Sequence, residues 1–341
     1  MRKKLFIIGN GFDIQHKIPS KYEDFHSFLK RYYPFHKDPL YIPSGGLVPK
    51  ILSPYGYRML DTFHAQEIAQ AFAYLDYTLT LTEESENWWN LESSLSKLHL
   101  IEEFDTESDR PFTAVMHNHS PENTIYYIGQ CFCMLYILFD MWVNQIDISN
   151  VTPNKSFKKL INPNEDYFLT FNYTKTLENT YNAKNVFHIH GVQGNAKKAF
   201  GHQKQDEDYI LRFCEDNRIP LSCLEGVKYL FEITEKDTRQ IWERNKEYFD
   251  SLSTDIQEIY SYGFSFSSVD MIYIFAICHS LDTSKITWYL SDFSSPEQIE
   301  TYKNRVISNG FQGDFSTFHI NNSKPNIKEI LGLFLKRRNK E

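Results

Sequence analysis

The fold class is decided by the stretch Lys3-Lys4-Leu5-Phe6-Ile7-Ile8-Gly9-Asn10-Gly11-Phe12-Asp13 near the start of the chain. Its short apolar run, with charge before it and a Gly-x-Gly turn after it, is typical of a buried parallel strand. Glycines at such a turn let backbone N–H groups approach a bound anion, as in nucleotide-binding α/β folds. The dinucleotide fingerprint needs a third small residue, however, and Ile14 stands there. The motif alone therefore leaves a nucleotide site and a plain strand-to-loop turn equally open.

The composition excludes several classes of protein. The chain has 341 residues and a net charge of −8, which suits one large domain with an insertion, or two domains, and disfavours nucleic acid as a partner. The five cysteines are odd in number and form no C-x-x-C pair, which argues against a disulfide framework or a structural zinc site. We therefore expect a cytoplasmic protein without a metal.

One apolar segment is long enough to raise the question of whether it forms a membrane helix or a buried core helix. Its uncharged run from Ile125 ends at Asp140, short of the roughly 18 residues that span a bilayer. The sequence therefore predicts a buried core helix and no membrane partner.

The rest of the chain alternates between strands and helices. Further strands are predicted at 166–171, 185–190, 258–263, 285–290 and 314–318. Helices are predicted at 22–33 (with Ser20 and Glu23 as a capping box), 61–77, 86–100, the apolar segment to 148, 175–181, 235–257, 297–308 and 326–338. This alternation favours a Rossmann-like α/β fold with a parallel sheet flanked by helices. We expect an α/β core formed by 1–34 and 151–341, with 35–150 as a mostly helical insertion after the first strand.

Polar residues follow four of the predicted strands directly. Besides Gly9 to Asp13, these are Asn172, His190-Gly191 and Gly263 to Ser265. Because ligands of open parallel sheets bind outside the carboxyl ends of the strands, we expect these residues to meet at one crevice.

Each residue type suits a role in nucleotide chemistry. Asn172 would hold a water or a ribose hydroxyl, His190 would act as general base near neutral pH, and Asp13 would orient a hydroxyl or polarise a base. Contacts to phosphate or ribose are expected from Gly9, Asn10, Gly11 and Ser265.

Structural roles compete with these assignments. Asn172 is placed to cap the helix predicted at 175–181, and a histidine at a strand end often only bonds a loop. His188 and His190 would point the same way from a strand and are spaced to ligate a metal, but no third ligand is near in sequence. We therefore rank a metal site below both alternatives.

Several motifs resemble the AbiH-type bacterial abortive-infection proteins. They are Ile7 to Asp13, Ile18 to Phe25, Trp89-Asn90-Leu91-Glu92, Phe171-Asn172-Tyr173-Thr174, His188 to Gly191 and Gly263-Phe264-Ser265. The order is that of the family, and the match covers most of the chain.

A more distant resemblance is to sirtuin-like proteins, which bind NAD. Matching positions in the same order are Gly9, Gly11, Ile18-Pro19, Phe25, Thr170-Phe171-Asn172, His190-Gly191 and Gly263-Phe264-Ser265. This resemblance implies a sirtuin-like core with NAD as ligand or substrate, Asn172 and His190 in the chemistry, and Phe12, Phe25, Thr170 and Gly191 among the binding residues. The paired C-x-x-C motifs of the sirtuin zinc ribbon are missing, so protein deacylation is not supported.

Together the resemblances imply an antiphage protein that cleaves the N-glycosidic bond to nicotinamide. Two alternatives stay open: a non-catalytic nucleotide sensor or adaptor of a defence system, and a toxin that cleaves nucleic acid. For 35–150, a phage-encoded trigger, another copy of the chain and another ligand all remain open as partners.

Overall fold

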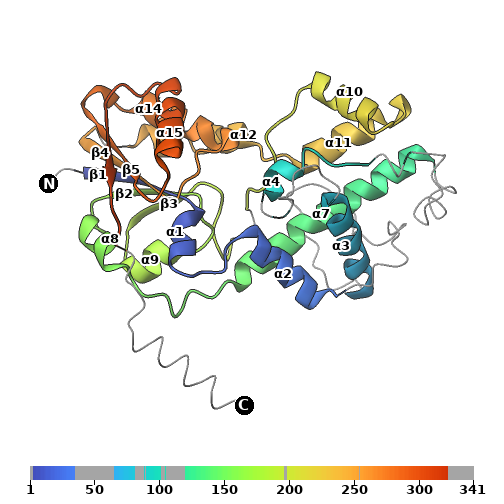
Figure 1. Ribbon diagram of the computed structural model, residues 1–341, viewed down its shortest axis with the longest axis horizontal. Coiled ribbons are helices and arrows are strands. Elements are labelled where there is room, and N and C mark those ends of the chain that lie inside the picture. Colours follow the sequence, from blue (N-terminus) through green and yellow to red (C-terminus); the bar gives the residue numbers. More distant parts are fainter. Residues whose placement is uncertain are drawn as a thin grey trace, which may run out of the picture.

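The computed structural model describes residues 3–34, 65–80, 88, 90–100, 104, 120–195, 198–252 and 254–321. Its centre is a six-stranded sheet in which every strand pairs parallel to its neighbours (Figure 1). The strands are β1 (Lys3–Ile8), β2 (Tyr167–Thr170), β3 (Asn185–His188), β4 (Ile256–Tyr262), β5 (Thr287–Ser291) and β6 (Asp314–Phe318). Their spatial order is β3-β2-β1-β4-β5-β6, the order of dinucleotide-binding folds. The predicted α/β class and parallel sheet are confirmed.

The register of the sheet places four strand ends side by side. Ile8 at the end of β1 pairs with Thr170 at the end of β2 and with Tyr262 at the end of β4. Thr170 in turn pairs with His188, the last residue of β3. The segments that follow these four strands therefore leave the sheet from one level edge.

Alternating side chains of the strands build two apolar layers. Leu5 and Ile7 pack on one face under α12 (Thr238–Arg244), α13 (Lys246–Asp250), α14 (Met271–Ser280) and α15 (Pro296–Ser308). Phe6 packs on the other face under α1 (Asn10–Gln15), α8 (Lys155–Leu160) and α9 (Thr176–Tyr181). Its ring stacks at 5.3 Å on Phe168 of β2 and at 5.0 Å on Tyr260 of β4. This aromatic row fixes the neighbours of β1 on both sides.

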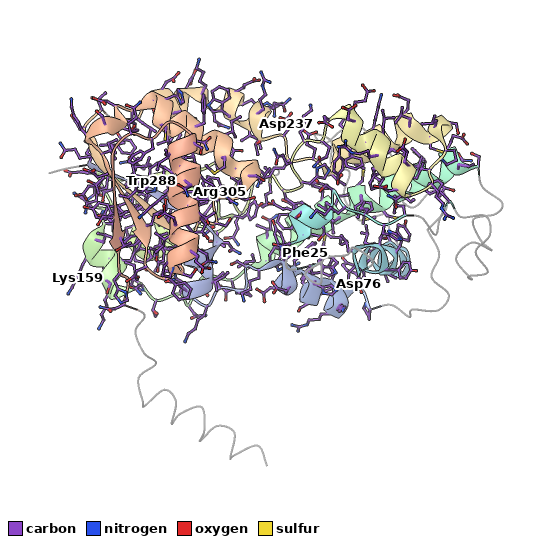
Figure 2. All side chains as sticks on the ribbon, turned by 45° about the horizontal axis from the view of Figure 1, so that its top comes forward. Phe25, Asp76, Lys159, Asp237, Trp288 and Arg305 are labelled. Carbon is purple, nitrogen blue, oxygen red and sulfur yellow. The ribbon has the colours of Figure 1, made fainter. Side chains whose placement is uncertain are left out.

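The remaining helices gather at the other end of the molecule (Figure 1). They are α2 (Tyr22–Tyr32), α3 (Ala65–Thr80), α4 (Leu91–Ser94), α7 (Pro121–Gln145), α10 (Glu207–Asp216) and α11 (Leu224–Thr234), and they share one hydrophobic cluster. In Figure 2, Phe25 lies in this helical half and Trp288 in the sheet half. α10 and α11 come from the connection between β3 and β4, which the sequence assigned to the α/β core without predicting these helices.

Helix α7 is the core helix that the apolar segment predicted. Among the described residues it is the one helix long and apolar enough to cross a membrane, yet 69% of its most apolar stretch is buried inside the protein. Ser120 caps it, accepting a hydrogen bond from the N–H of Asn123 at 3.3 Å, and Pro121 occupies the first position.

Some predicted boundaries are wrong. The helix predicted at 235–257 is two short helices, α12 and α13, and its last residues begin β4, because Ile256 and Ile259 are buried in the sheet. Helix α2 is capped one residue later than expected: the N–H of Lys21 donates to the Asp24 carboxylate at 2.9 Å. Within the described part of the helix predicted at 86–100, only α4 is helical. Residues 61–64 and 326–338, which were also predicted to be helical, lie outside the described residues.

Candidate functional site

A cavity of about 280 Å³ lies between the carboxyl edge of the sheet and the helical cluster. The structure brings eight of the predicted site residues to its wall: Gly9, Asn10, Gly11, Asp13, Asn172, His190, Gly263 and Ser265. They come from the four segments that follow β1, β2, β3 and β4. The opposite wall is supplied by residues of the helical half, Tyr22, Glu92, Phe139, Trp142 and Ile146.

Asp13 is a buried carboxylate at the cavity wall, 1% exposed. Its Oδ2 accepts a hydrogen bond from the Thr174 hydroxyl at 2.7 Å. Because Thr174 has only one hydroxyl proton, the Thr176 hydroxyl, 2.8 Å away, donates to Thr174. Oδ1 has no hydrogen-bond partner within the described part of the chain. Burial raises the pKa of Asp13 to about 6, although the bond from Thr174 lowers it.

Asn172 has an anchored backbone, and its side-chain amide lies near the carboxylate of Asp13, whose pKa it lowers. Its N–H donates to Thr170 Oγ1 at 3.1 Å, and its carbonyl oxygen lies 2.8 Å from Nδ1 of His188. The amide is buried at the cavity wall, and neither its nitrogen nor its oxygen has a hydrogen-bond partner among the residues that the structure describes. Helix α9 begins at Thr176 with Lys175 as its N-cap, so the alternative role of Asn172 as the helix cap is wrong. Buried unpartnered amides are rare in proteins, so this one indicates a ligand-binding position.

His190 lines the cavity and is 4% exposed, with its ring edge-on to Phe171 and Tyr273. Its Nε2 lies 3.4 Å from Oδ1 of Asp270. Burial and the nearby positive charge of Lys236 hold its pKa well below the usual value of 6.5. The ring is therefore neutral at physiological pH and able to accept a proton.

A buried ion-pair network continues from Asp270 across the floor of the cavity. Nζ of Lys236 lies 3.1 Å from Asp270 Oδ1 and 3.3 Å from Oε1 of Glu92 on α4. Burial alone would lower the pKa of Lys236, but the two carboxylates outweigh it and raise the pKa above its usual value. Burial raises the pKa of Asp270 to about 6 against the opposing effect of Lys236. The network ties the helical half to the sheet half at the site.

The Gly-x-Gly turn packs closely against the turn after β4. Gly9 N–H donates to the carbonyl of Tyr262 at 3.0 Å, and Gly11 N–H donates to that of Gly263 at 3.0 Å. A Cβ on Gly9 would lie 2.4 Å from the Gly263 oxygen, and one on Gly263, which has φ +67, would lie 2.3 Å from the Phe12 nitrogen. The glycines therefore permit backbone-to-backbone contact, and donation from Gly9 or Gly11 to a phosphate would require these bonds to break.

The mouth of the cavity is polar. The Asn10 amide donates to the Ser20 carbonyl at 2.9 Å and accepts from the Ser20 hydroxyl at 2.6 Å. Ser265 is exposed at the cavity wall. A ligand that used the Asn10 amide would have to displace Ser20.

Four residues expected at the site lie behind its wall instead. Phe12 is fully buried against Phe157 and Tyr262 in the sheet half. Phe25 is buried in the helical half (Figure 2). Its ring centroid lies 5.4 Å from that of Phe139 and 5.3 Å from that of Trp142, and both of these residues line the cavity. Thr170 supports Asn172, because its hydroxyl oxygen accepts a hydrogen bond from the Asn172 N–H. Gly191 is a turn residue with φ +89 directly after His190.

The two histidines of the proposed metal pair face different partners. β3 ends at His188, so strand alternation does not extend to His190. The His188 ring nitrogens lie 2.8 Å from the Asn172 carbonyl and 2.8 Å from the Glu178 carboxylate, while His190 faces Asp270. The expectation that both rings point the same way is wrong. In the described ranges, no three His, Cys, Asp or Glu side chains are grouped to hold a metal.

Sequence reasoning missed the ion-pair network. Glu92 belongs to the Trp89–Glu92 motif, which was a usable signal. Lys236 stood at the start of the helix predicted at 235–257, with nothing in the sequence to distinguish it from the other charged residues there. Asp270 had no signal beyond its place five residues after Ser265.

The fold and the cavity define an α/β protein with a small polar site at the carboxyl edge of a Rossmann-ordered parallel sheet. The sequence profile described as Bacteriophage abortive infection AbiH matches residues 5–292. The chain therefore belongs to the AbiH family, and every cavity residue falls within the matched range. No curated protein and no solved structure matches the chain.

Proposed function

We propose that this AbiH protein binds the ribosyl end of NAD or a related nucleotide and hydrolyses its N-glycosidic bond during abortive infection. The observation that carries the proposal is the pair of buried, unpartnered groups at adjacent strand ends, Asp13 Oδ1 and the Asn172 amide, in one cavity with a neutral His190. The cavity volume of about 280 Å³ is at the lower limit for small-molecule sites. It suits a ribosyl unit with its base better than a whole dinucleotide.

The chemistry follows from the roles of the three side chains. The bond between C1′ and the nicotinamide nitrogen breaks, and nicotinamide leaves with the electron pair as a neutral molecule. The Asp13 carboxylate stabilises the positive charge that develops on the ribosyl unit. Asn172 holds a ribose hydroxyl and orients the attacking water. Water bonds to C1′ and gives its proton to His190.

Release of nicotinamide by the purified full chain tests the proposal. The reaction should be followed with NAD alone and with extracts of phage-infected cells, since a defence enzyme is restrained in healthy cells. We expect activity in one of these conditions, and its loss in His190→Gln and Asn172→Ala. His319→Ala is the matched control, because His319 lies outside the cavity with its side chain 63% exposed. Intact NAD in every condition would refute the proposal.

A second function, ligand sensing without turnover, is favoured by the network on Lys236. Glu92 belongs to the helical half and Asp270 to the sheet half, so a ligand that disturbs the network would change the contact between the halves. Tight binding of NAD without product, together with full antiphage protection by His190→Gln, would favour sensing over hydrolysis.

A further inference from the structure

We infer that the cavity selects a ligand group with a delocalised positive charge, so that the minimal ligand is a pyridinium riboside such as nicotinamide riboside. Neutral ribosides would bind poorly, and the phosphates and the second nucleoside of NAD would stay outside. This inference rests on the proposed function and names the part of the substrate that the site recognises.

The first reason is that Asp13 lacks a cationic partner. Its carboxylate is 1% exposed and makes no ion pair with any described residue, and its polar neighbours are the uncharged side chains of Thr174, Asn172 and Thr176. Buried carboxylates are normally paired with a cation or neutralised. The unpartnered Oδ1 at the cavity wall is therefore placed to face a positive group of the ligand.

The second reason is that the cavity has little to offer a phosphate. Three carboxylates line it (Asp13, Glu92 and Asp270) against one lysine. That lysine, Lys236, is already shared between Glu92 and Asp270. The N–H groups of Gly9 and Gly11 donate to backbone carbonyls. The lining thus repels anions and attracts cations.

The third reason is the aromatic character of the wall. Phe171 and Phe264 lie with ring centroids 4.4 Å apart beside the strand ends. Phe139 and Trp142 of α7 line the cavity from the helical half. Aromatic faces together with a carboxylate are the surroundings in which proteins bind organic cations. A flat pyridinium ring fits this combination.

The test compares two ligands that differ by one hydride on the ring, which removes both the positive charge and the aromaticity, so the dependence of the preference on Asp13 isolates the effect of charge. Nicotinamide riboside is a cation, and its reduced dihydro form carries the same ribose and carboxamide without the charge. Binding is measured by calorimetry on the intact chain, and on His190→Gln where the wild type consumes the riboside. We expect the cation to bind about ten-fold or more tightly. Asp13→Asn should abolish that preference, while Asp250→Asn, at an exposed position on α13, should keep it.

The outcomes separate this inference from the proposed function. Equal affinity for the two forms in the wild type, or a preference that survives Asp13→Asn in a folded protein, would overturn the inference. Hydrolysis of NAD without any binding of nicotinamide riboside would also overturn it, yet leave the proposed function standing. Binding of the riboside cation without turnover would support the inference and count against hydrolysis.

Discussion

Replacing Asp13 by asparagine should change how the stability of the protein depends on pH. Burial raises the pKa of the Asp13 carboxyl from 3.8 to about 6, so the folded state holds this proton more tightly than the unfolded state. The contribution to stability is therefore complete below the unfolded pKa and is lost as the pH rises through the folded pKa. Since one pKa unit is worth about 1.4 kcal/mol, ionised Asp13 costs the folded state about 3 kcal/mol at pH 7 and above.

Asp13→Asn removes this titration and keeps the size of the side chain. Urea unfolding of both proteins from pH 4.5 to pH 8 is the assay, and the relevant quantity is the difference between their unfolding free energies. We expect the variant to gain on the wild type by about 2 kcal/mol between pH 4.5 and pH 8, because about 1 of the 3 kcal/mol is already lost at pH 4.5. Asp250→Asn, at an exposed position on α13, is the matched surface variant and is measured in the same way.

A pH-independent difference between Asp13→Asn and the wild type would refute the reasoning. It would mean that the carboxyl is solvated, or paired with a cation, in the folded protein. A gain in stability combined with loss of ligand binding is the expected signature of a residue kept for function.

The remaining predictions concern the rest of the site. Lys236→Met leaves the buried carboxylate of Asp270 and the half-buried carboxylate of Glu92 without their cation and should lower the unfolding free energy by about 3 to 5 kcal/mol. Partial recovery is expected at pH 5, below the pKa of about 6 of Asp270; an unchanged urea midpoint would contradict the buried network. Gly263→Ala should destabilise far more than Gly194→Ala, because both have positive φ but only Gly263 faces a backbone atom at 2.3 Å; equal losses in thermal melting would show that strain alone matters. In NMR titration, the ring of His190 should stay neutral at pH 6.5, where a free imidazole is half protonated; a midpoint near 6.5 would mean that solvent reaches it.

Local sequence was enough for the sheet. All six strands were predicted. The central strands β1, β2 and β4 are apolar runs with buried side chains that end before a polar or glycine residue, whereas the edge strands β3 and β6 carry no buried side chain and were predicted from their aromatic and β-branched residues. The parallel arrangement of the strands also followed, since the connections are long enough to return to the same edge. The convergence of Asp13, Asn172 and His190 at one cavity could be predicted for the same reason.

The state of each polar group was decided by the tertiary structure. Thr174, which satisfies one oxygen of Asp13, is 161 residues away in the sequence, and Glu92 is 144 residues from Lys236. No local pattern encodes such a partner, so the sequence did not reveal that the Gly9 N–H was already used or that Asp13 lacked a cation. The sequence by itself determined which strand ends meet. The folded chain determined which of their groups stay unpaired, because hydrogen bonding is settled by distances of about 3 Å that only packing creates.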